Sequence, residues 1–187
     1  MSIRPLSIGR RTRRSGFTLL EVVVYLGIVV LVTVPATTIA WVFIHDAVAQ
    51  ERVAEVDAVG AFALTALQRH LRSAQVLDTV TVYDVHPGTL AFTRGDGMRI
   101  VLDTAQRDVP FGGQTVTVRK LRVQEGSGPA LDLTSDAVDV TQFIVRNRTT
   151  AGMTSIEVTL GLAAVNPGDD TRYGAQRTWT TAATFRR

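Results

Sequence analysis

The organisation of this chain is decided by the stretch GFTLLEVVVYLGIVVLVTVPATTIAWVFI, residues 16–44. Residues 17–44 within it are 28 residues with a single charged side chain, the carboxylate of Glu21. A helix that spans a bilayer needs about 20 apolar residues, so this stretch predicts a transmembrane helix. The apolar core of an ordinary secretory signal is much shorter, about 7–15 residues.

A basic segment precedes the apolar stretch. Residues 1–15 contain five arginines and no acidic residue, whereas Asp46 and Glu51 follow the stretch. Because positive charge marks the cytoplasmic side of a span, we expect the leader to stay inside and the rest of the chain to be exported. The five residues are Arg4, Arg10, Arg11, Arg13 and Arg14.

The exported part is not basic. Without those five arginines, 15 basic and 17 acidic residues remain, a net charge of −2. A head that binds nucleic acid would carry a clustered basic patch, so nucleic-acid binding is not predicted. The one later basic cluster, Arg119-Lys120-Leu121-Arg122, is expected to be a solvated strand edge.

Glu21 needs a physical reason, because a carboxylate inside a membrane span costs several kcal/mol. If the chain is cut between Gly16 and Phe17, a new α-amino group appears one helical turn away. Phe17 and Glu21 then stand at positions i and i+4, on the same helix face. A carboxylate there also offsets the positive end of a helix dipole.

The sequence from Gly16 to Glu21, with its basic leader and apolar helix, resembles the processing motif of type IV prepilins and type II secretion pseudopilins. The resemblance implies that a membrane prepilin peptidase cuts after Gly16 and N-methylates Phe17. It also implies that Glu21 pairs with the N-terminal amine of a neighbouring subunit during assembly. The implied partners are this peptidase, other pilin or pseudopilin subunits, an inner-membrane assembly platform, and the lipid bilayer before assembly.

The position of proline departs from the family. Many major pilins carry a helix-bending proline at the twenty-second mature position, which is Thr38 here, whereas this chain has Pro35. Proline removes one backbone hydrogen bond and kinks a helix interior. The sequence therefore predicts a helix kink at Pro35, three residues earlier than in those relatives.

Three other interpretations of the N-terminal segment remain open. One is a plain single-pass anchor with Glu21 near the headgroups. Another is a secretory signal cut after Ala40, in the small-residue context Thr38-Ile39-Ala40. The third is a membrane-tethered or secreted binding domain or enzyme that uses the segment only for export.

The helix is expected to continue beyond the membrane as an amphipathic helix, uninterrupted from Phe17 to Gln75. Apolar residues recur there at steps of three or four, which predicts one stripe packed against the C-terminal half. The sequence thus divides into a leader (1–16), a transmembrane and assembly helix (17–44), its amphipathic extension (45–75) and a β-rich head (76–187). The stripe is Val56, Val59, Ala63, Leu67, Leu71 and Ala74.

The head is expected to form an antiparallel β-sheet, which makes the fold class α+β. Alternation with period two, separated by turn sequences, predicts seven strands. Phase changes at Arg119-Lys120 and Thr141-Gln142 predict bulges. The last three strands and the helix end 67–74 resemble J-type minor pseudopilins and W-type minor pilins. The strands are Thr79–Val85, Thr89–Thr93, Met98–Asp103, Thr115–Gln124, Val138–Arg148, Ser155–Val165 and Ala175–Phe185.

The head shows no catalytic or cofactor pattern. The chain has no cysteine, and no nucleophile, phosphate-loop or zinc motif is present. The sequence therefore predicts a structural subunit, without enzyme activity, cofactor or metal site. Trp179 and Phe185 are expected to pack in the core. Four loop aspartates are interpreted as solvated turn residues, with a calcium site as the alternative: Asp96, Asp103, Asp169 and Asp170.

Overall fold

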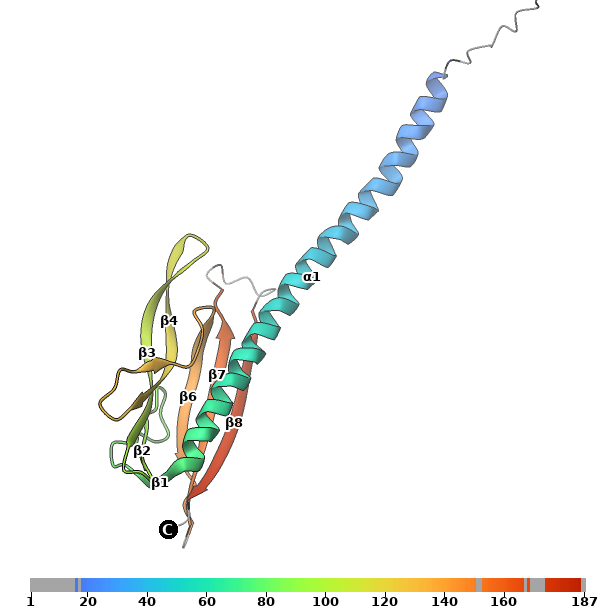
Figure 1. Cartoon of the computed structure of the whole chain (residues 1–187). Coiled ribbons are helices and arrows are strands. Elements are labelled where there is room, and N and C mark those ends of the chain that lie inside the picture. Colours follow the sequence, from blue (N-terminus) through green and yellow to red (C-terminus); the bar gives the residue numbers. More distant parts are fainter. Residues whose placement is uncertain (1–15, 17, 151–152, 167, 169–173, 186–187) are drawn as a thin grey trace, which may run out of the picture. The chain divides into compact units, whose positions relative to one another are not determined.

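The computed structural model describes residues 16, 18–150, 153–166, 168 and 174–185 (Figure 1). In this part of the chain, one long helix precedes eight strands, so the fold is α+β. The chain divides into two units, Met1–Ile44 and His45–Arg187. The elements are α1 (Leu19–Ser73), β1 (Ala74–Leu77), β2 (Leu90–Arg94), β3 (Arg99–Phe111), β4 (Gln114–Glu125), β5 (Leu131–Asp132), β6 (Val138–Asn147), β7 (Thr154–Ala164) and β8 (Gln176–Phe185).

The strands form two antiparallel sheets. One has five strands in the order β1-β2-β3-β4-β5, and the other has three in the order β6-β7-β8. Neighbouring strands pair in sequence order, as short connections between antiparallel strands favour. Figure 1 shows the C-terminal part of α1 lying along β6, β7 and β8.

The predicted stripe on α1 forms one wall of the main core. Val56, Ala63 and Leu67 are fully buried, and Leu71 is nearly so. They belong to one apolar cluster that includes residues of both sheets, and Val59 is packed against it. Burying one helical face against the sheets stabilises the otherwise solvated second half of α1.

The helix ends two residues earlier than predicted. Ser73 is its last residue, and its hydroxyl donates a hydrogen bond to the carbonyl oxygen of His70 at 2.7 Å. Ala74 and Gln75, expected to be helical, begin β1, which pairs with β2. A strand of four residues is too short for its alternation to be recognised in the amino-acid sequence.

The long alternating strand is confirmed. In β7 the predicted inward residues are all buried, and they face the core together with β6. The predicted bulge at Thr141-Gln142 is also present, as a register shift between Val140 and Gln142. Opposite it lies Gly161, where a Cβ atom would come within 2.9 Å of the Thr141 hydroxyl. The inward residues are Ile156, Val158, Leu160, Leu162 and Ala164.

The predicted bulge at Arg119-Lys120 is wrong. Strands β3 and β4 pair without a break from Ile100↔Glu125 to Phe111↔Gln114. The phase changes because the hairpin buries opposite faces at its two ends. Leu102 packs in the main core, whereas Val109 packs in a second small cluster. The tip closes through two glycines with positive φ, Gly112 and Gly113, as a two-residue type I′ turn requires.

The predicted strand Thr79–Val85 is also wrong. The segment forms only one isolated bridge, between Val82 and Thr89. Thr81 interrupts the alternation, because its buried hydroxyl donates to the carbonyl oxygen of Ala91 and accepts from the Ala91 N–H. A threonine that satisfies backbone groups in this way fixes a loop in place of a strand.

The basic cluster 119–122 is not a solvated strand edge. Strand β4 lies between β3 and β5, and Lys120 is only 2% exposed. Its ammonium donates to the carbonyl oxygen of Thr134 at 3.3 Å and pairs with Asp136. Arg122 binds the carboxylate of Asp103 through two hydrogen bonds, at 3.0 and 2.8 Å. The positive charges of Lys120 and Arg122 are therefore matched by acidic side chains within the head.

Candidate membrane and assembly segment

The N-terminus of α1 is capped by Thr18. The N–H of Glu21 donates to the Thr18 hydroxyl at 3.3 Å, and the N–H of Val22 donates to the Thr18 carbonyl oxygen at 3.2 Å. A Thr-x-x-Glu sequence is the capping-box pattern, which satisfies donors that the first helical turn leaves free. Sequence reasoning missed this role of Thr18, although the spacing of Thr18 and Glu21 carries the signal.

Two of the predicted site residues, Gly16 and Glu21, lie at this helix end. Gly16 is exposed, and a Cβ atom added there would meet nothing within 4 Å. Glu21 is exposed in the first turn of α1, beside Thr18. Phe17, the predicted site of methylation and partner of Glu21, lies outside the described residues.

The first half of α1 has no covering within its unit. Every described side chain from residue 18 to residue 44 is exposed. These include large apolar side chains such as Leu31, which is 75% exposed. The helix is long and apolar enough to cross a membrane. A helix that is apolar on all sides is stable only in lipid or among other apolar helices.

Pro35 lies inside α1, and the helix continues through it. A proline leaves the carbonyl four residues earlier without its helical donor. One turn further on, the hydroxyls of Thr37 and Thr38 both donate to the carbonyl oxygen of Val34, each at 2.9 Å. Such hydroxyl bonds satisfy side chains inside an apolar medium and bend helices locally. The kink at Pro35 stays a prediction.

The polar residues of the head are organised as ion pairs. Asp96 accepts hydrogen bonds from Arg94 and from the Met98 N–H, which lower the pKa of its carboxyl to about 2. Glu157 lies between Arg146 and Arg148, and hydrogen bonds from both lower its pKa. These carboxylates neutralise neighbouring cations across strands and turns.

Of the four aspartates considered for calcium, two lie in the described part of the chain and two do not. Asp96 and Asp103 are each engaged by an arginine, Arg94 and Arg122 respectively. Asp169 and Asp170 lie outside the described residues. Over the described ranges, no three His, Asp or Glu side chains gather as metal ligands.

Comparison with known proteins gives no match to a family model, a curated protein or a solved structure. The features of this chain that bear on function lie in α1. They are the capped, carboxylate-bearing end of α1 and the uncovered apolar surface that follows.

Proposed function

We propose that the chain is a minor pilin or pseudopilin, a structural subunit of a type IV pilus-like or type II secretion filament. The observation that carries the proposal is the position of Glu21. This carboxylate stands in the first turn of a helix that is otherwise apolar and exposed as far as Ile44. Glu21 also comes shortly after a basic leader and the junction of Gly16 and Phe17.

Processing is the first step of this function. Prepilin peptidase would hydrolyse the peptide bond between Gly16 and Phe17, releasing the leader with the Gly16 carboxylate and leaving the amine on Phe17. A methyl group from a donor cosubstrate of the peptidase would then be transferred to that amine. Glycine suits the cleaved position because it has no Cβ to crowd the approach of peptidase carboxylates. Gly16 is exposed, as a cleavage site must be.

Before assembly, the subunit would wait in the inner membrane as a single-pass protein. The leader arginines hold the N-terminus in the cytoplasm. Residues 45–187, the amphipathic extension together with the head, would be exported, and their core includes the buried stripe of α1. In this state Glu21 lies near the cytoplasmic interface, where water and lipid headgroups make its charge tolerable.

Assembly would exchange lipid for neighbouring helices. The inner-membrane platform would move the apolar first half of α1 into a bundle of like helices, giving a periplasmic or extracellular filament. There an unpaired carboxylate is costly. The methylated amine of Phe17, from the same or an adjacent subunit, neutralises Glu21. Because the net attraction of a buried ion pair is often close to zero, the pair acts mainly by penalising wrong alignment.

The mass of the mature N-terminus tests this function. Cells that produce the full chain should yield a protein beginning at methylated Phe17. A protein beginning at Trp41 would instead indicate a cleaved secretory signal. An unprocessed N-terminus in a strain with active peptidase would indicate a plain membrane anchor.

A further inference from the structure

The two edges of the sheet β6-β7-β8 differ in whether another segment covers them. The β6 edge is covered by the segment 84–88. The N–H of Gly88 donates to the Phe143 carbonyl oxygen at 2.8 Å, and the N–H of Asp84 donates to the Val145 carbonyl oxygen at 2.9 Å. The N–H of Phe143 donates to Nδ1 of His86 at 2.9 Å. This edge cannot accept another strand without displacing the segment.

The β8 edge, in contrast, is open. Strand β8 pairs with β7 over ten consecutive positions without a bulge, and it is the outermost strand of its sheet. Next to it, the N–H of Ala164 donates to the Ala175 carbonyl oxygen at 2.8 Å. Since antiparallel ladders alternate, odd-numbered residues bond to β7 and even-numbered residues turn their N–H and C=O outward. Across the described residues, no further backbone partner is found for these outward groups.

The open edge also lacks the usual protection against pairing. Exposed edges normally carry a lysine, a proline or a bulge, or they are very short. Between Arg177 and the end of β8 the sequence has no charge, proline or glycine. The exposed even-numbered side chains are small or uncharged, namely Gln176, Thr178, Thr180, Ala182 and Thr184.

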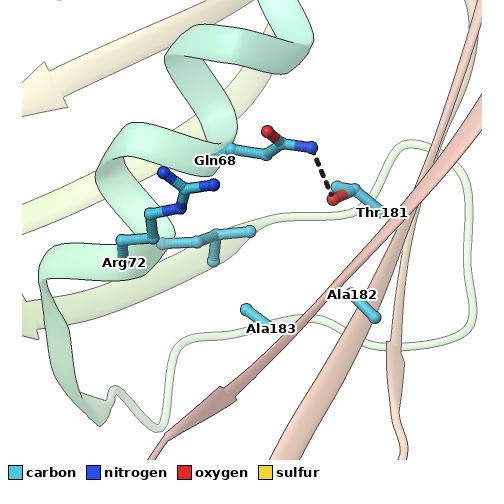
Figure 2. Close-up of a pocket in the computed structure, with 6 residues that line it drawn as sticks. Gln68, Arg72, Thr181, Ala182 and Ala183 are labelled. Atoms are coloured by element: carbon cyan, nitrogen blue, oxygen red, sulfur yellow. Dashed lines mark hydrogen bonds between the residues drawn. The ribbon is translucent and has the colours of Figure 1, made fainter.

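A small pocket beside this edge supplies a cation. Figure 2 shows Gln68 of α1 reaching Thr181 of β8 at a pocket of about 120 Å³, which Arg72, Ala182 and Ala183 also line. The amide of Gln68 donates to the Thr181 hydroxyl at 3.3 Å and ties helix and strand together. Arg72 is exposed, and it forms no ion pair with any residue that the structure describes. A guanidinium in this position suits a carboxylate.

We propose that the β8 edge binds an extended segment of a different protein chain by strand pairing, with a carboxylate of that segment reaching Arg72. The backbone edge requires an extended occupant. The uncharged outward side chains favour uncharged, β-branched neighbours. The guanidinium of Arg72, which lines the same pocket as Thr181 and Ala183 and has no ion-pair partner among the described residues, adds a charged requirement.

A second copy of this chain does not fit as the occupant. The other described edges are the four-residue β1, with its register shift, the two-residue β5, and the tip of the β3–β4 hairpin, where β3 extends beyond β2 and β4 beyond β5, whereas β6 is covered. Arg107, Asp108 and Pro110 disfavour pairing along this part of β3. On β4, the N–H of Arg119 already donates to the carboxylate of Asp139. The edge that a copy offers most readily is therefore its own β8. A two-fold β8–β8 contact would turn the two α1 helices in opposite directions. This step rests on the proposed function, in which all subunits share one membrane orientation.

The test uses the full chain in detergent micelles and a labelled peptide, Thr-Val-Glu-Val-Thr-Val, with blocked ends. Fluorescence anisotropy should show saturable binding. Replacing the peptide glutamate by glutamine, or introducing Arg72→Gln, should each weaken binding about tenfold. The two changes together should weaken it no further, because they remove the same pair.

A proline substitution tests whether the peptide binds through backbone hydrogen bonds to β8. Thr180→Pro removes an outward N–H and leaves the ladder to β7 intact, so circular dichroism should be unchanged while binding falls at least tenfold. Thr180→Ala is the matched control and should bind like the wild type. Unchanged affinity of Thr180→Pro, equal binding of a peptide N-methylated at alternate residues, or no saturable binding would overturn the proposal.

Self-pairing is the competing outcome. Because the chain has no cysteine, Thr180→Cys introduces a unique thiol on the edge. A disulfide dimer formed quantitatively under mild oxidation would overturn the proposal in favour of a second copy. The peptide assay does not depend on cleavage at Gly16. Its failure with normal N-terminal processing would therefore leave the filament-subunit function standing.

Discussion

Gly60 of α1 lies directly against the indole ring of Trp179 in β8. A Cβ atom at residue 60 would come within 2.2 Å of the ring atom Cη2. Glycine in a helix interior costs about 1 kcal/mol relative to alanine. Here that cost makes room for the indole ring against α1, and Trp179 packs against the main core as predicted, together with buried Phe185.

Gly60→Ala should lower the free energy of unfolding of the head by about 1–3 kcal/mol, because the indole must move. The measurement is thermal or denaturant unfolding followed by circular dichroism. In a Trp179→Leu background the same substitution should instead stabilise by about 1 kcal/mol, since only helix propensity remains. A destabilisation of equal size in both backgrounds would contradict the steric explanation.

The pair of Lys120 and Asp136 should respond asymmetrically to mutation. The side chain of Lys120 is 2% exposed and that of Asp136 is 73% exposed. Asp136→Asn leaves a buried ammonium without its counter-ion and should cost about 3 kcal/mol, whereas Lys120→Met leaves only a solvated carboxylate and should cost less. Denaturant unfolding of both variants checks this order. The reverse order would contradict burial of the ammonium.

His70 should make the head less stable at mildly acidic pH. Burial lowers the pKa of His70 below 6.5, and Glu125 at 3.8 Å offsets this only in part. The folded state therefore binds fewer protons than the unfolded state near pH 6.5. The stabilising effect is present above pH 6.5 and is lost as pH falls through the folded pKa. Unfolding curves between about pH 7.5 and 5 should show this slope, and His70→Gln should flatten it.

Glu21→Ala should leave cleavage at Gly16 largely intact and membrane insertion unchanged or improved, but reduce incorporation into filaments. The charge is costly in lipid and useful only between subunits. The measurement compares membrane and sheared-filament fractions, with Glu51→Ala, in the second half of α1, as the matched control. Normal incorporation of the mutant would contradict the charge pair for this subunit, or identify it as the tip, where no subunit lies ahead.

Truncation should reveal the dependence of the sheets on α1. A protein beginning at Ile44 retains the stripe and should be soluble and unfold cooperatively. One beginning at Thr79 loses Leu67 and Leu71 as well as β1, exposes the apolar sheet face, and should aggregate. Equal solubility and equal unfolding of the two proteins would count against this packing.

Sequence patterns predicted the elements in which buried residues recur at a fixed spacing. The stripe on α1 and the alternation in β7 follow fixed periods, so both could be recognised from the chain alone. The burial of Lys120 could not be recognised in this way, because a lysine among strand residues normally indicates exposure to solvent. Its counter-ion Asp136 lies in a separate connection, and only the folded chain brings the two together.

At the candidate site, Gly16, Phe17 and Glu21 lie within one short stretch of sequence. They could therefore be proposed without a structure. The pocket with Gln68 and Arg72 was not predictable. Its two sides, α1 and β8, are separated by more than one hundred residues, and an arginine near a helix end is ordinarily only a favourable charge for the helix dipole.

The hairpin of β3 and β4 has a consequence for how this chain can vary in length. Its base buries Leu102, on one face, while its tip buries Val109, on the other. Removing or adding one residue between them would turn the tip over and also take Phe111 away from Arg52, whose guanidinium lies 5.2 Å from the ring centroid. Insertions and deletions in this arm should therefore survive in steps of two residues.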